Sequence, residues 1–134
     1  MQIQINPHET LKQFQDCFAE IFPFLRIKFF SKAHLAGQGS FSAEELPATE
    51  TFAAAGKIPS PDSMEVSGAM SVKDLESMFQ EKFGIAAQVM RKSGSAWIMT
   101  TRTDDWTLRR ENETGREDSW FLLNQILMIS DFFG

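Results

Sequence analysis

The residues best suited to chemistry or to recognition are concentrated between positions 91 and 116. This segment holds two of the three tryptophans, six basic residues and four acidic residues, in a chain whose formal net charge is −5. Tryptophan and arginine are enriched among the residues that dominate binding energy at protein–protein interfaces. The segment therefore predicts a protein-binding surface, and its candidate binding residues are Arg91, Lys92, Trp97, Asp105, Trp106 and Arg109.

Three alternative interpretations of this segment remain open. The charged residues could be solvated neighbours that form ion pairs and helix caps of little energetic value. The hairpin from Arg91 to Trp97 could bind single-stranded nucleic acid through phosphate contacts and base stacking, although the acidic net charge disfavours nucleic acid as a partner. The adjacent Asp104 and Asp105 could serve a small hydrolytic or acid/base enzyme, but neighbouring strand residues point to opposite faces. An enzyme is therefore the less favoured prediction.

Metal and cofactor sites lack the necessary ligands. His8 and His34 have no neighbour at metal-ligand spacing, and a zinc site needs three or four ligands. The single cysteine, Cys17, cannot form an internal disulfide. No glycine-rich loop has the spacing of a dinucleotide- or phosphate-binding motif. We therefore expect no metal and no cofactor.

Length and composition predict one globular domain that spans residues 1–134. A chain of 134 residues with 43% hydrophobic and 23% charged residues can bury one core and not two. The first residues lack the pattern of a signal peptide, and no apolar run is long enough to cross a bilayer. A lone cysteine is typical of a reducing compartment. These features predict a cytoplasmic protein without a membrane partner.

A pattern of strand, helix and strand occurs twice, at an offset of 61 positions, so that residues 1–32 and 62–101 form two similar halves. Thr10 and Ser71 each begin a helix N-cap pattern, and Gly84 stands where a left-handed C-terminal cap belongs. Apolar residues follow at the three- and four-residue spacing of amphipathic helices. The two stripes are Leu11, Phe14, Phe18 and Ile21, and Val72, Leu75, Phe79 and Phe83.

The remaining chain consists of a long connection, residues 32–63, and a C-terminal helical extension, residues 104–134. Residues 120–133 are apolar around nearly the whole circumference of a helix, with a buried strand as the alternative. One sheet hides only one stripe of a helix, so a second copy of the chain is expected to cover the rest. We therefore predict a homo-oligomer formed through Trp120, Leu123 and Leu127.

Together these elements predict an α+β two-layer sandwich. Its mixed sheet has about five strands, its two βαβ-like halves follow a ferredoxin-like or related arrangement, and an apolar helix ends the chain. The predicted core is Ile3, Ile5, Leu11, Phe14, Phe18, Ile21, Leu25, Ile27, Val66, Leu75, Phe79, Phe83, Val89, Trp97, Leu122 and Ile126.

The segment from Gln88 to Asn112 resembles a family of small uncharacterised bacterial proteins that share Arg-Lys-Ser-Gly-x-x-Trp and Thr-Asp-x-Trp-Thr-Leu motifs. In this chain the first motif begins at Arg91 and the second at Thr103. The resemblance extends upstream through the phenylalanine-rich helices but not to the apolar C-terminus. It implies a bacterial cytoplasmic protein and attaches no activity, ligand or mechanism. We therefore expect a non-catalytic, homodimeric protein-interaction module, with single-stranded nucleic-acid binding as the alternative.

Overall fold

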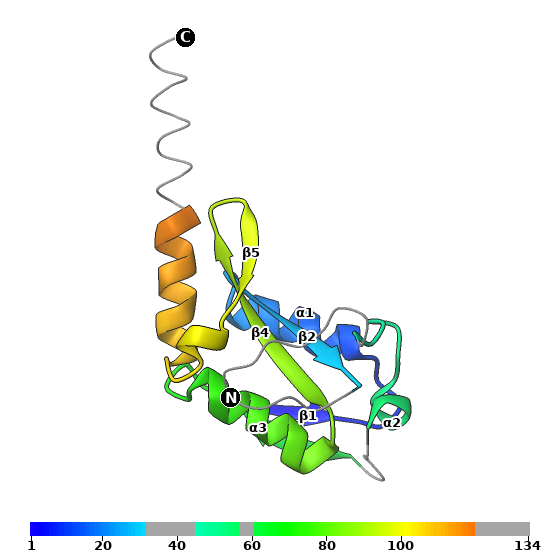
Figure 1. The fold of residues 1–134 in the computed structure, drawn as a ribbon. Coiled ribbons are helices and arrows are strands. Elements are labelled where there is room, and N and C mark those ends of the chain that lie inside the picture. Colours follow the sequence, from blue (N-terminus) through cyan, green and yellow to red (C-terminus); the bar gives the residue numbers. More distant parts are fainter. Residues whose placement is uncertain (32–44, 57–60, 120–134) are drawn as a thin grey trace, which may run out of the picture.

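A computed structural model describes residues 1–31, 45–56 and 61–119 (Figure 1). The expectations for Trp120, Leu123 and Leu127, and for the core positions Leu122 and Ile126, lie outside these residues. The elements in chain order are β1 (Gln2–Ile5), α1 (Leu11–Ile21), β2 (Leu25–Phe30), α2 (Phe52–Ala55), β3 (Asp62–Glu65), α3 (Val72–Phe83), β4 (Ala86–Ser93), β5 (Ala96–Met99), the 3₁₀ turn η2 (Thr101–Thr103) and a helix over 108–119.

The α+β class, the five strands and the C-terminal helix are confirmed, but the strands are divided between two sheets. β1 pairs with β3, and a second sheet has the order β2-β4-β5; every pairing is antiparallel. This differs from the single mixed sheet expected from the sequence. Within each half, the strand before the helix and the strand after it join different sheets, so each strand pairs with its equivalent from the other half.

Local sequence signals explain where the two long helices begin and end. Thr10 and Gln13 form the capping box at the start of α1, and the Ser71 hydroxyl accepts the backbone N–H of Asp74 at the start of α3. Gly84 ends α3 with φ 66°, a left-handed conformation that suits a residue without a Cβ.

Replacing Gly84 with alanine is expected to lower the free energy of unfolding by about 1 to 2 kcal/mol, because a Cβ strains the left-handed backbone. No atom lies within 4 Å of the position that this Cβ would take, so steric overlap adds nothing. Urea denaturation should show a smaller loss for Gly84→Asn, since asparagine tolerates this conformation better. Equal losses for the two variants would contradict the backbone explanation.

The two halves are related by an internal pseudo-twofold axis. Ile3 pairs with Met64, which is 61 residues further along the chain, and Ile27 pairs with Val89, which is 62 residues further along. The extra residue belongs to α3, which has 12 residues where α1 has 11. Each of these pairs therefore joins equivalent positions, as expected where a twofold axis crosses an antiparallel pair of strands.

The repeat extends beyond the two halves that the sequence pattern indicated. After each half, a turn runs alongside the start of that half's long helix and accepts the helix's first two backbone amides. The turn then leads into another helix, which begins at 52 or at 108. The equivalent bonds run from Leu11 to Glu50 and Lys12 to Ala48, and from Val72 to Trp106 and Lys73 to Asp104. Thr51 and Thr107 cap the helices that follow, by accepting the amides of Ala54 and Arg110.

One hydrophobic core receives side chains from both halves and both sheets. Phenylalanines dominate it, with Phe14, Phe29 and Phe79 in mutual edge-to-face contact at ring-centroid distances of 5.0–6.1 Å. Most predicted core residues are buried, whereas Ile3 and Ile21 are partly buried at its margin. Trp97 is not part of this cluster. Among the residues described, no helix is long and apolar enough to cross a membrane.

Candidate functional site

The three-stranded sheet has one face in the core and one face directed away from it. Ile27, Phe29 and Val89 are buried against the helices. Because successive strand residues alternate between faces, their neighbours lie on the opposite side. The register places nine such neighbours on that side, of which Phe30, Ala86 and Gln88 are buried. We call the six that are exposed or partly exposed the outer sheet face: Arg26, Lys28, Met90, Lys92, Trp97 and Met99.

The outer sheet face is basic and partly apolar. β2, β4 and β5 contain no aspartate or glutamate, although the whole chain has five more acidic than basic residues. The guanidinium of Arg26 stacks over the Trp97 ring, 4.0 Å from its centroid, which is a favourable cation–π geometry. Lys28 forms an ion pair with Glu45 at 3.0 Å, whereas no ion pair is seen for Lys92 within the described residues.

The structure divides the binding residues predicted from the sequence between two sides of the sheet. Lys92 and Trp97 are cross-strand partners on the outer sheet face. Arg91 is adjacent to Lys92 and therefore points to the other side, where its cross-strand partners are Leu25 and Ile98. Trp97 was predicted to point into the core, and that prediction is wrong: its cross-strand pairing puts it on the outer face.

Arg91 holds the helix over 108–119 against β4. Its Nη1 lies 3.1 Å from Oε2 of Glu111, whose side chain is fully buried, and 13% of the Arg91 side chain is exposed. Burial raises the pKa of Glu111, while the side chain of Thr103 and the cations of Arg91 and Arg110 lower it in part. Arg91 is therefore engaged in a structural ion pair and presents little surface to a partner.

Two further contacts fix the same helix close to the sheet. The side-chain oxygen of Asn112 accepts the backbone N–H of Phe24 at 2.9 Å. A Cβ at Gly115 would lie 3.0–3.1 Å from atoms of Phe24, Arg91 and Lys92, so this glycine permits a close approach of helix and strand. In Figure 1 the helix, drawn in orange, stands beside the β4–β5 hairpin.

The other predicted binding residues surround the start of this helix. The Arg110 guanidinium stacks over the Trp106 ring at 3.6 Å, and Arg91 lies 5.7 Å from the same ring. Arg109 packs beside Gly68, whose carbonyl accepts the Arg109 backbone N–H. Asp105 is exposed on the preceding turn. These residues form a second group, separate from the outer sheet face.

Sequence reasoning missed Arg26, Met90 and Met99 as members of the candidate site. The alternation in β2 already places Arg26 and Lys28 on one face, opposite Leu25 and Ile27. What the sequence does not show is that β2 pairs with β4, which brings this face beside Lys92 and Trp97.

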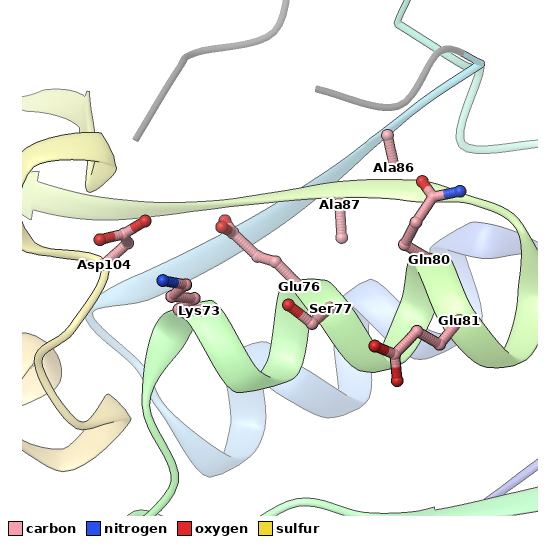
Figure 2. A pocket seen from close by; sticks show the side chains of 8 residues that line it. All are labelled: Lys73, Glu76, Ser77, Gln80, Glu81, Ala86, Ala87 and Asp104. Atoms are coloured by element: carbon pink, nitrogen blue, oxygen red, sulfur yellow. The ribbon is translucent and has the colours of Figure 1, made fainter. Parts of the chain in front are cut away.

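A small pocket beside α3 is a weaker candidate. Its volume is about 140 Å³, and Figure 2 shows Lys73, Glu76 and Asp104 gathered at one end. Glu76 accepts the backbone N–H of Val89 at 3.0 Å, just as Gln15, its equivalent in α1, binds the carbonyl of Ile27 at 3.0 Å. Glu76 thus satisfies a backbone amide in the interior of β4, and the pocket is smaller than the roughly 300–1,000 Å³ usual for small-molecule sites.

Neither a metal centre nor a known relative guides the choice between these sites. Within residues 1–31, 45–56 and 61–119, no group of three or more potential ligands could hold a metal ion. Comparison with known protein families, curated proteins and solved structures finds no match to this chain. The outer sheet face remains the best candidate because it combines exposed charge, an aromatic ring and apolar side chains on one sheet.

Proposed function

We propose that this protein is an interaction module that binds an acidic segment of a partner protein through the outer sheet face. The observation that carries the proposal is the Arg26–Trp97 stack beside Lys92, on strands without a single carboxylate. Arginine and tryptophan are among the residues enriched at the energetic centres of protein interfaces. The basic character of this face, in an acidic chain, favours a partner of opposite charge.

A protein partner explains this face better than single-stranded nucleic acid does. A base would need to stack on Trp97, and the Arg26 guanidinium already covers one side of that ring. Met90 and Met99 add flexible apolar surface of the kind that protein interfaces use. A nucleic acid would also need basic residues free for phosphate contact, and on this face Lys28 is already paired with Glu45.

Reversing two charges on the outer sheet face is expected to weaken partner binding about tenfold or more, because anchor residues dominate interface energies. The variant is Arg26→Glu/Lys92→Glu, and the measurement is quantitative capture from the source cell by the immobilised full chain. The matched control, Lys12→Glu/Lys82→Glu, makes the same charge change on the exposed surfaces of α1 and α3.

Three outcomes distinguish the interpretations. Loss of the same acidic partners from the face variant but not from the control supports the proposal. Equal capture by all three proteins would remove its basis. Salt-sensitive binding of a fluorescent 20-nucleotide single strand that the face variant abolishes, without any protein partner, would instead establish the nucleic-acid function.

A further inference from the structure

The backbone of β5 directs hydrogen-bonding groups outward along the edge of the outer sheet face. Lys92 donates its backbone N–H to the Phe24 carbonyl, so the polar backbone groups of Lys92 point toward β2. Its partner Trp97 therefore belongs to a non-hydrogen-bonded pair, and the N–H and C=O of Trp97 point away from β4. Strand alternation gives the backbone of Met99 the same outward direction.

Within the described residues, these outward groups have no hydrogen-bond partner. β5 also has none of the charged or proline residues that commonly protect an edge strand: its sequence is Ala-Trp-Ile-Met. Ile98 and Met99 are 37% and 43% exposed, and Met1 is the one other exposed large hydrophobic residue described. This edge therefore combines free backbone groups with apolar side chains.

We infer that β5 binds an extended, acidic segment of the partner protein as an added fourth strand. The inference rests on the proposed function and specifies its mode of recognition. Backbone hydrogen bonds to Trp97 and Met99 would provide affinity, as in other complexes formed by strand addition. Alternate side chains of the added strand then fall on the outer sheet face, where Arg26 and Lys92 select acidic residues.

A second copy of this chain fits the edge less well than an acidic segment does. Antiparallel pairing of two β5 strands about a twofold axis would place both outer faces on the same side of the joined sheet. The two basic outer faces would then adjoin on one side of the joined sheet, and β2, β4 and β5 of the second copy would offer Arg26 and Lys92 no acidic residue. Charge complementarity thus favours a different, acidic occupant.

A phage library that displays random nine-residue peptides is first selected for binding to the immobilised full chain. The experiment then compares the affinity of a selected peptide for Met99→Pro and for Met99→Ala. Proline removes the outward N–H, which the β4 ladder does not use, whereas alanine keeps it and removes the same side chain. The peptide is expected to bind Met99→Pro about tenfold more weakly than wild type, the size expected for a lost backbone hydrogen bond. The affinity of the peptide for Met99→Ala should stay within about threefold of its affinity for the wild type.

A second measurement keeps the inference testable if Met99→Pro does not fold. In the wild-type protein, bound peptide should slow amide hydrogen exchange at Trp97 and Met99, and not at Ile98, whose N–H faces β4. Selection of no peptide, unchanged exchange at these amides, or equal affinities of the two Met99 variants would overturn strand addition. Where exchange is unchanged or the two Met99 variants bind equally, peptide binding that still depends on Arg26 and Lys92 leaves the proposed function standing. Peptide binding that does not depend on Arg26 and Lys92 would contradict both the proposed function and strand addition.

Size-exclusion chromatography with light scattering tests the competing occupant. A dimer that Met99→Pro dissociates and Met99→Ala does not would assign the edge to a second copy and overturn the acidic-segment inference. A chain that is monomeric and binds the selected peptide supports the acidic-segment inference.

Discussion

Replacing Phe79 with alanine is expected to lower the free energy of unfolding by about 3 to 5 kcal/mol, as measured by urea denaturation. The Phe79 side chain is fully buried, and its ring centroid lies 5.0 Å from those of Phe14 and Phe29 and 5.8 Å from that of Phe83. These rings come from both halves of the chain. Truncation therefore removes apolar contact area and leaves a cavity that such a closely packed cluster cannot fully close.

The internal repeat supplies an independent test of the same explanation. Phe18 occupies the position in α1 that Phe79 occupies in α3, and it is equally buried, so Phe18→Ala should cause a loss of similar size. Gln80→Ala, on the exposed side of α3, should change stability by less than about 0.5 kcal/mol. A urea midpoint near the wild-type value for either phenylalanine variant would contradict a shared core at the pseudo-twofold axis.

The sequence predicts the helices and their ends well because the signals are local. The capping pattern at Thr10, the cap at Ser71 and the left-handed Gly84 each act within one turn of their helix. The phenylalanine stripes repeat at helical spacing and are buried as expected. The helix that starts at 108 lies within the helical extension expected over residues 104–134, and its start also has a local signal, because Thr107 followed by Leu108 matches Thr51 followed by Phe52.

Which strands pair, and which face turns outward, depends on contacts between residues far apart in the chain. Alternation in β2 and in β5 shows that each strand has two faces, but not that β4 lies between them. A tryptophan in a short strand suits a buried face and an exposed face equally well. The assignment of Trp97 to the core was therefore not decided by any local signal. The candidate site was thus found in part, through Lys92 and Trp97, while Arg26 required the register of the folded sheet.

Replacing Arg91 with methionine is expected to lower the free energy of unfolding by about 3 to 5 kcal/mol at pH 7, because it leaves a buried carboxylate without its partner. Glu111 is fully buried and bonded to Arg91 at 3.1 Å. Methionine preserves much of the arginine side-chain volume, so the loss reports mainly on the charge. The measurement is urea denaturation monitored by circular dichroism.

The pH dependence of this loss follows from the raised pKa of Glu111. Burial raises that pKa above its value in the unfolded chain, so the folded protein binds the proton more tightly. The contribution of this group to stability is therefore fully present below the unfolded pKa and is lost as the pH rises through the folded pKa. Removing the Arg91 cation raises the folded pKa further, so the difference between wild type and Arg91→Met should widen from pH 4 to pH 7.

The double variant Arg91→Met/Glu111→Leu separates the lost charge partner from lost packing. Replacing both members of a buried ion pair with apolar residues is often neutral or stabilising, so the double variant should recover most of the stability lost in Arg91→Met. No recovery, together with a difference independent of pH, would mean that the ion pair is not the source of the effect. Conversely, if Arg91→Met stays stable but loses partner binding at pH 7, Arg91 belongs to the recognition surface, and the assignment of that surface to the outer sheet face is incomplete.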